Sequence, residues 1–305
     1  MDFRDAVFDT IRSIMREDAD VVVATNDMGA MILDEIRAEM PERVINVGIA
    51  EQNLMAVSGG LALAGKKVYV FGISAHLVGR SLEHIKLDIC VGNLPVVILG
   101  VGPGLAYGAD GPTHHGTEDV AIMRALPNMT IFNPCDGIST AALVRAAYDL
   151  GSPAYVRVDK ENIQPIYSPT DDFDCGFKIW QEGTDVTVLS TGVLTFQALA
   201  AAETLASEGV SVRVVDVFRL KPLDEGKLID VMKESGAVLV CEEHTPNGGL
   251  ASAIGNIIAQ SRLNPKFRAA TLPDVYLLGS ASRAWAHDKF GLTSGDLAKL
   301  LRSLV

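Results

Sequence analysis

The sequence has 305 residues, of which 48% are apolar and 21% are charged. This balance is typical of a folded α/β protein, and the length allows one large domain or two ordinary ones. The 38 acidic residues outnumber the 26 basic ones and give a formal charge of −12 at pH 7. Nucleic acid and anionic membrane are therefore excluded as main partners, because neither attracts an acidic surface.

The first segment, MDFRDAVFDTIRSIMRED, predicts an amphipathic helix rather than a signal peptide. No apolar run approaches the roughly 20 residues that a membrane span needs. These features predict a cytoplasmic protein. The four cysteines form no CxxC pair, and no zinc or redox motif is visible in the sequence.

Apolar runs in the first half of the chain predict buried strands, with helical segments between them. Their continuous apolar character favours a parallel sheet that is covered on both faces. The predicted strands are residues 20–25, 43–47, 67–71, 94–101, 129–133 and 153–158.

The stretch 159–184 breaks this rhythm with two prolines and a cluster of acids, which is typical of a linker. After it, strands and helices alternate again. We therefore expect two doubly wound α/β domains, each with a mostly parallel sheet, of which the second is the smaller. The expected boundaries are residues 1–165 for the first domain, 166–184 for the linker and 185–305 for the second domain.

The segment GIAEQN (48–53) follows the second predicted strand. Ligands of open α/β sheets bind at such strand ends. Glu51 is the single acid between an apolar strand and the small, apolar segment LMAVSGGLALAG. Two interpretations remain open from the residues alone: a charge at the positive end of the following helix, or a group that binds a ligand.

A second segment, GVGPGLAYGADGPTHHGTED (100–119), follows the fourth predicted strand. A Gly-rich loop of this length in a compact domain is usually functional. Asp110 and His114 are candidates for an acid/base pair or for binding substrate hydroxyls, and the alternative is a solvated turn. Adjacent histidines without a third ligand at a suitable spacing do not predict a metal site in this chain.

Three stretches together resemble the transketolase family of thiamine-diphosphate enzymes. They are RVINVGIAEQNLMAVSGGLALAG, GADGPTHHGTEDVAIMRALPNMTIFNPCD and EEHTPNGGLASAIGN. The resemblance covers the whole chain and implies a pyrimidine-binding domain followed by the family's carboxy-terminal domain.

No stretch resembles the family's diphosphate-binding domain with its GDG…N metal motif, and the first predicted helix begins almost at Met1. The resemblance therefore implies the carboxy-terminal subunit of a split transketolase. The amino-terminal, diphosphate-binding subunit would be a separate partner chain, and two copies of each would form a heterotetramer. The Mg²⁺ or Ca²⁺ ion that accompanies thiamine diphosphate would be bound mainly by that partner.

The resemblance also implies roles for residues near the cofactor. Glu51 matches the acid that hydrogen-bonds the aminopyrimidine ring nitrogen, and a carboxyl in such a pocket is expected to have a raised pKa. Ile49 and Gln52 flank this acid and are expected to contact the cofactor. His76, within SAHL, stands where the family has a phenylalanine that stacks on the aminopyrimidine.

On the substrate side, Asp110 and His114 match residues of the family that contact substrate hydroxyls and the carbonyl region. Arg4 and Lys160 fall near positions where the family uses arginines for the sugar phosphate, and the alternative for both is an ordinary surface charge. Lysine lacks the bidentate fork of arginine, so the grip on a phosphate is expected to differ.

This sequence departs from the family at further positions, in the stretch that follows SAHL and in the Gly-rich loop. Gly79 and Leu82 replace aromatic residues of the family, and Gly102 replaces a histidine that contacts substrate. With His76 and Lys160, these changes leave the sugar open, including a sulfo- or deoxy-sugar phosphate. The competing interpretations are a subunit like 1-deoxy-xylulose-5-phosphate synthase or the β subunit of 2-oxoacid dehydrogenase E1, and a regulatory or scaffold subunit without catalysis.

Overall fold

The computed structural model describes residues 2–305. The helices are α1 (Phe3–Glu17), α2 (Met31–Glu39), α3 (Glu51–Leu63), α4 (Ser74–His84), α5 (Asp119–Arg124), α6 (Gly137–Asp149), α7 (Leu194–Ala206), α8 (Glu225–Lys233), α9 (Leu250–Gln260), α10 (Arg283–Phe290) and α11 (Ser294–Arg302). Shorter helical turns are η1 (Pro41–Arg43), the π-type η2 (Ile85–Cys90) and η3 (Gly108–Asp110).

The strands belong to two sheets. They are β1 (Val21–Thr25), β2 (Val44–Asn46), β3 (Lys67–Ile73), β4 (Val96–Val101), β5 (Thr130–Phe132), β6 (Ala154–Val158), β7 (Phe177–Gln181), β8 (Val186–Ser190), β9 (Val212–Val217), β10 (Arg219–Lys221), β11 (Ala237–Cys241) and β12 (Lys266–Ala270).

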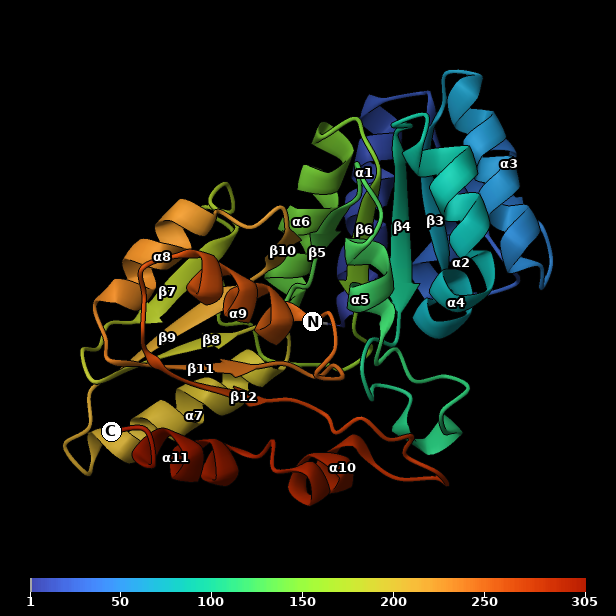
Figure 1. Cartoon of the computed structure of the whole chain (residues 1–305). Coiled ribbons are helices and arrows are strands. Elements are labelled where there is room, and N and C mark those ends of the chain that lie inside the picture. The colour runs from blue at the N-terminus through green and yellow to red at the C-terminus, as the bar shows by residue number, and fades with distance from the viewer. Residues whose placement is uncertain (1) are drawn as a thin grey trace.

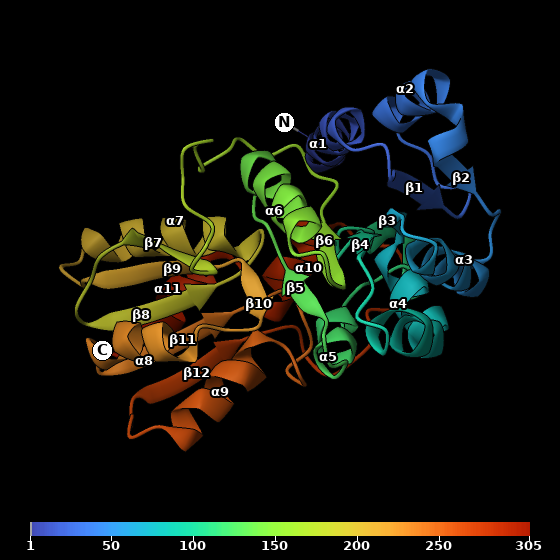
Figure 2. The ribbon, with the colours of Figure 1, turned by 90° about the horizontal axis from the view of Figure 1, so that it is seen from above.

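The first sheet has seven strands in the order β10-β5-β6-β4-β3-β1-β2. Six of them are parallel, and only β10 runs antiparallel, against β5. Helices α1, α2 and α6 pack on one face, and α3, α4 and α5 pack on the other (Figures 1 and 2). The central strands are buried along their whole length because both faces are covered.

The second sheet has five strands in the order β12-β11-β8-β9-β7. Its strands are parallel except β7, which pairs antiparallel with β9. Helices α7 and α11 pack on one face, while α8 and α9 pack on the other (Figure 1). One apolar cluster continues from α3, α4 and β5 of the first domain into α8 and α9 of the second, so the two domains share buried surface.

The predicted fold class, two doubly wound and mostly parallel α/β domains, is confirmed. Two strands add to it. Strand β7 lies inside the range 166–184 that the sequence assigns to a linker, and β10 leaves the second half of the chain to extend the first sheet. Both are antiparallel edge strands, which the apolar runs of the sequence do not indicate.

Helix α1 forms as predicted. Asp2 caps its start by accepting a hydrogen bond from the backbone N–H of Arg4, and one face of the helix is buried at positions such as Val7, Ile11 and Ile14. Within residues 2–305 there is no helix both long enough and apolar enough to cross a bilayer.

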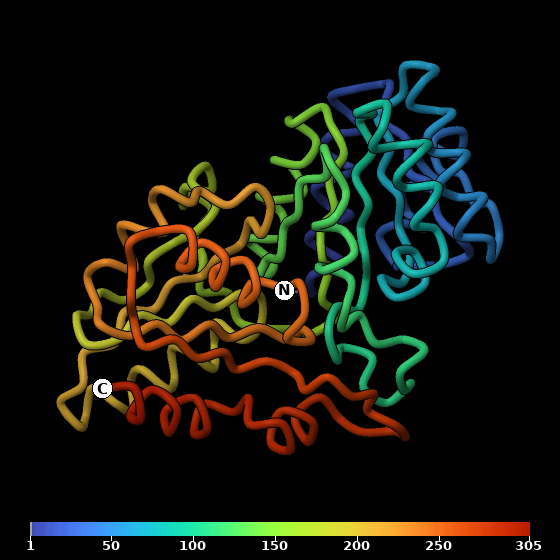
Figure 3. The backbone as a smooth tube through the Cα atoms, in the orientation of Figure 1, coloured from blue at the N-terminus to red at the C-terminus, as the bar shows by residue number. Residues whose placement is uncertain are grey.

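The Gly-rich loop lies beneath the first sheet, beside the segment that leads into α10 (Figure 3). The backbone N–H of Ala281 donates to the carbonyl of Gly108 over 3.4 Å. The loop that follows β4 is therefore held by the second domain as well as by the first.

Candidate active site

Glu51 begins helix α3, after a short connection from strand β2. The small residues that follow it let α3 pack closely against the next helical layer. A side chain at Gly59 would overlap the backbone carbonyl of Asp88, on η2. This close packing accounts for the glycine at position 59 and holds α3, which carries the acid, against η2.

The carboxylate of Glu51 is buried, with 3% of its side chain exposed. Asn26, just after β1, donates from Nδ2 to Oε1 over 3.1 Å. Arg80, on α4, donates from Nη1 to Oε2 over 2.8 Å. The Nδ1 atom of His76, also on α4, lies 3.8 Å from Oε1. Two interpretations of this acid were open, a charge at a helix start and a ligand-binding group. The geometry agrees with part of each, because Glu51 is the first residue of α3 and also faces a polar cluster.

The expectation of a raised pKa for Glu51 is wrong for this chain. Burial favours the protonated acid, but a backbone hydrogen bond, the Arg80 guanidinium and the His76 ring outweigh burial and lower the pKa below its ordinary value. The apolar surroundings of Glu51 are visible in the sequence, whereas its contact with Arg80 is not. The carboxylate is therefore ionised at neutral pH.

His76 is held between two groups. Its Nε2 lies 3.0 Å from the backbone oxygen of Thr113, which can only accept, so Nε2 carries the proton. Burial, His114 and Arg80 lower the pKa of His76, although Glu51 opposes them. The ring is thus neutral at pH 7, and its unprotonated Nδ1 faces the carboxylate.

A row of rings leads from the acid to a lysine. The His76 and His114 rings meet edge to face with centroids 4.9 Å apart, and the His114 and Tyr107 rings follow at 5.9 Å. The Nζ atom of Lys160 lies 4.0 Å from the centroid of the Tyr107 ring, as in a cation–π contact. The structure thus brings Glu51, His76, His114 and Lys160 to one edge of the sheet.

Arg4 lies at the far end of this row. Its charge acts on the phenol of Tyr107, opposing the burial that raises the pKa of that group. The guanidinium also pairs with Asp2 at 2.9 Å, so its charge is partly balanced within the chain.

Three candidates do not join these contacts. Asp110 is exposed, and its backbone N–H bonds the carbonyl of Tyr107. Among the described residues, its side chain forms no hydrogen bond with His114, whose ring nitrogen instead meets the Thr113 hydroxyl at 2.9 Å. The pairing of Asp110 with His114 is therefore absent from this structure. Ile49, 77% exposed, and Gln52 lie on the outer surface at the start of α3.

The second domain holds both loops of the site through Glu243 and Arg283. Arg283 bonds Glu243 at 2.8 and 2.6 Å, and it bonds Asp159 at 3.1 and 2.8 Å. Glu243 also accepts a hydrogen bond from the backbone N–H of Leu105 in the Gly-rich loop. Asp159 in turn accepts from the backbone N–H of Lys160. The EEHTPNGG motif thus supplies the acid that connects the site's two loops.

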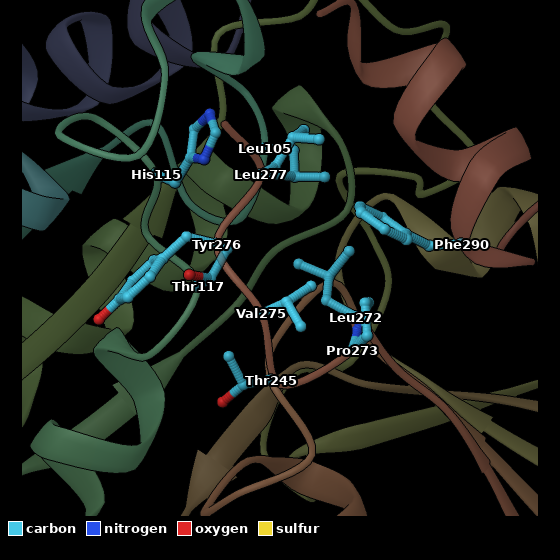
Figure 4. A pocket seen from close by; sticks show the side chains of 10 residues that line it. All are labelled: Leu105, His115, Thr117, Thr245, Leu272, Pro273, Val275, Tyr276, Leu277 and Phe290. Atoms are coloured by element: carbon cyan, nitrogen blue, oxygen red, sulfur yellow. The ribbon is translucent and has the colours of Figure 1, made fainter. Parts of the chain in front are cut away.

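A separate hollow lies between the Gly-rich loop and the segment before α10 (Figure 4). Its walls are mostly apolar, with His115 at one end. Across residues 2–305, no group of three or more histidines, cysteines or acids is placed to hold a metal ion. The polar cluster around Glu51 is therefore the better candidate for chemistry.

Both halves of the chain match models of known protein domains. Residues 1–165 match the model of the transketolase pyrimidine-binding domain, and residues 176–297 match that of the transketolase carboxy-terminal domain. The chain belongs to the transketolase family. The resemblance seen in the sequence is thereby confirmed.

Some relatives in the transketolase family are of similar length to this chain. One subunit of the apulose-4-phosphate transketolase of Phocaeicola vulgatus is 34% identical over 303 residues, which are 97% of this chain and 95% of that one. The 6-deoxy-6-sulfo-D-fructose transketolase subunit SqwH of a Clostridium species is 31% identical, over 97% and 92% of the two chains. A solved structure described as a split gene transketolase, inactive beta4 tetramer, superposes with a TM-score of 0.89 at 33% identity, over 100% and 98%.

One position at which this chain departs from its family, Gly102, has a physical explanation. Its φ is +81°, and a side chain there would overlap the ring of Tyr107. The tyrosine therefore fills the space next to the position where other transketolases have a histidine. Gly79 leaves the neighbouring part of α4 open, because nothing lies within 4 Å of a side chain built there, and Leu82 is exposed on the same helix.

The residues present fit the aminopyrimidine of thiamine diphosphate. Oε1 of Glu51 accepts one bond from Asn26 and retains a second lone pair. The unprotonated Nδ1 of His76 lies beside it, so two acceptors face the same space and suit a donor such as a protonated ring nitrogen. Exposed Ile49 adds apolar surface at the start of α3.

Sequence reasoning missed Asn26, Arg80 and Tyr107. Asn26 follows β1, so the rule that ligands bind at the carboxyl ends of strands points to it. Arg80 stands four residues after His76 on one helix, a spacing that places both on the same face. Tyr107 gave no signal, because its position depends on the backbone at Gly102.

Proposed function

We propose that this chain is the subunit of a split transketolase that carries the pyrimidine-binding and carboxy-terminal domains. With a separate amino-terminal subunit that binds the diphosphate, it transfers a two-carbon ketol unit from a ketose to an aldose. The observation that carries this proposal is the buried carboxylate of Glu51, which retains an acceptor site beside His76. The family and its subunit-sized relatives support the split architecture.

When bound, thiamine diphosphate would supply the carbon that attacks the ketose carbonyl. The residues of this chain orient that chemistry. Glu51 accepts a hydrogen bond from the aminopyrimidine ring nitrogen and shares its proton. His76 packs against the ring, and Ile49 and Gln52 border it.

On the substrate side, the rings of His114 and Tyr107 lie between the acid with its neighbour His76 and Lys160. We assign His114 to proton movement at the substrate's carbonyl and hydroxyl end. Exposed Asp110 contacts a substrate hydroxyl once the partner subunit closes the site. Lys160 and Arg4 are the cations for the anionic end of the sugar.

Two relatives suggest which sugars to test. One is named for apulose 4-phosphate and the other for 6-deoxy-6-sulfo-D-fructose, so a phosphate or a sulfonate marks each named substrate. Lys160 is a point charge that suits either anion. We propose a ketose that carries one such group.

The partner subunit is part of the proposal. It would bind the Mg²⁺ or Ca²⁺ ion and the diphosphate, and two copies of each chain would form a heterotetramer. Light scattering on the co-expressed pair tests this arrangement. A mass equal to one copy of each chain would contradict it.

Reconstitution with the partner tests the reaction. Glu51→Gln is expected to lower the rate at saturating cofactor by about 100-fold or more, because the amide cannot share the ring proton. Glu35→Gln is the matched control, since Glu35 is exposed and pairs with Arg12 away from the site. Near-full activity of the Glu51→Gln complex would remove Glu51 from the mechanism.

A synthase-like reaction is the second candidate, because the chain is also 33% identical to 1-deoxy-D-xylulose-5-phosphate synthase of Bacillus licheniformis, over 98% of this chain and 48% of that one. Supplying pyruvate as the donor separates the reactions of the synthase and of 2-oxoacid dehydrogenases from ketol transfer. Turnover of pyruvate without turnover of ketoses would overturn the proposed function. A complex without affinity for thiamine diphosphate would instead support a regulatory or scaffold subunit.

A further inference from the structure

Arg80 reaches the buried carboxylate from the neighbouring helix. Its Nη1 lies 2.8 Å from Oε2 of Glu51, although 56% of the arginine side chain is exposed and only 3% of the glutamate side chain is. Helix α4 bends directly after Arg80, at Ser81, where φ is −113° and ψ is 15°. The pair therefore joins a fixed acid to a cation on the outer part of a bent helix.

The two oxygens of Glu51 have different neighbours. Oε2 is held by Arg80, whereas Oε1 accepts from Asn26 and lies near His76. A carboxylate held at one oxygen by Arg80 and at the other by Asn26 has its plane fixed, so the remaining lone pair of Oε1 points in one direction. That direction is toward His76, where the cofactor ring is expected.

We propose that Arg80 is a positioning residue, which clamps one oxygen of Glu51 and keeps the other turned, unprotonated, toward the cofactor ring. The inference rests on the proposed function for the identity of that ring. The role is distinct from binding, because Arg80 acts through Glu51. It also explains how a buried acid stays ionised before any cofactor arrives.

The groups that face Glu51 support this assignment. Arg80 and His76 come from α4, and the uncharged Asn26 comes from the end of β1; His114 lies one ring further away. His76 is neutral at pH 7 because its own pKa is lowered. Arg80 is therefore the full positive charge at the carboxylate at pH 7, and its removal leaves mainly a backbone hydrogen bond to oppose burial, so the protonated acid becomes more favourable than in the native chain.

The first test measures the carboxyl directly in the full chain without partner or cofactor. Glutamate labelled with ¹³C at the carboxyl is titrated by NMR, and the Glu51 signal is assigned by its loss in Glu51→Gln. In Arg80→Met we expect the titration of Glu51 to move to higher pH. Arg80→Lys, which retains a charge, should restore most of the difference.

Arg16→Met is the matched control, because the Arg16 side chain is also 56% exposed and pairs with a glutamate, Glu39. It should leave the Glu51 titration unchanged. An unchanged titration in Arg80→Met would overturn the proposal, as would an equal shift in Arg16→Met.

The second test uses the complex with its partner. Calorimetry in buffers of different ionisation enthalpy counts the protons taken up when thiamine diphosphate binds. An ionised Glu51 requires a proton from solvent for the shared ring site, and each proton taken up makes the affinity fall about tenfold per unit of rising pH. Arg80→Met should take up fewer protons than the native complex below the raised pKa of its Glu51.

The outcomes separate the two proposals. If the native complex binds thiamine diphosphate and Arg80→Met takes up protons as the native complex does, the positioning role is wrong and the proposed function stands. If the native complex does not bind the cofactor, the proposed function fails, and the carboxyl titration still decides whether Arg80 sets the ionisation of Glu51.

Discussion

Two buried glutamates of this chain pair with arginine in opposite ways. Glu243 is bonded by Arg283, whose side chain is only 9% exposed and also bonds Asp159. Glu51 is bonded by Arg80, whose side chain is 56% exposed. The first pair lies inside the contact between the domains, whereas the second pair joins the buried acid at the start of α3 to an arginine that reaches the surface.

The difference in exposure between the two arginines shows which ion pair contributes more to the stability of the fold. Charges that are removed from water interact strongly and are costly to separate. A half-exposed arginine retains water as an alternative partner, so its loss is less costly than that of a buried arginine. The molecule therefore has one ion network that is closed to water behind the site, and one at the acid that water reaches from the arginine side.

The largest expected effect comes from Arg283→Met. It leaves Glu243 and Asp159 as buried acids without their cation, which typically costs about 3–5 kcal/mol of unfolding free energy. Denaturant unfolding followed by circular dichroism measures this loss. A loss below about 1 kcal/mol would show that the two networks do not differ as proposed.

Low pH should reduce the difference in stability between Arg283→Met and the native chain. Burial favours protonated Glu243, but Arg283 and His287 outweigh it and lower the pKa of the acid below its ordinary value of 4.5. Its stabilisation is thus complete above pH 4.5 and declines as the pH falls toward the folded-state pKa. The deficit of Arg283→Met should therefore be greatest near neutrality and smaller in acid. A deficit independent of pH would exclude Glu243 as its source.

Lys160 tests whether the buried ion network of Arg283, Asp159 and Glu243 positions a substrate-binding residue. Its backbone is bonded by Asp159, which Arg283 holds, and its Nζ lies over Tyr107. In the complex, Lys160→Met should raise KM for an anionic sugar about tenfold with little change in kcat. Lys289→Met is the control, because Lys289 also lies over an aromatic ring, that of Trp285. An equal effect of both variants would exclude a role for Lys160 in the site.

The smallest effect on stability is expected for Arg80→Met. The pair with Glu51 contributes about 1 kcal/mol, because water competes for the half-exposed guanidinium and Asn26 still bonds the buried acid when the arginine is removed. The same unfolding measurement applies. A loss as large as that of Arg283→Met would show that Arg80 belongs to the rigid framework.

Much of the fold followed from apolar runs. The first predicted strand, 20–25, corresponds to β1 (Val21–Thr25), and 153–158 contains β6 (Ala154–Val158). Strands β7 and β10 were missed because short edge strands need few apolar residues and take their pairing from the rest of the sheet. Such pairing is a tertiary property that local sequence does not contain.

The site was predicted in its parts but not in its electrostatics. Glu51 was found because a lone acid after an apolar strand is costly without a partner. Its partner within the chain, Arg80, lies 29 residues away, and no local pattern joins the two. The predicted direction of the pKa shift was wrong for that reason, and the roles of the site residues remain predictions.

Strand β10 has a practical meaning for anyone who divides the chain. It comes from the second half but completes the edge of the first sheet beside β5. A fragment ending near residue 165 would expose the N–H and C=O groups of β5 as an open edge, which invites aggregation between fragments. The first half should therefore be produced together with residues 219–221, or with a designed cap in their place.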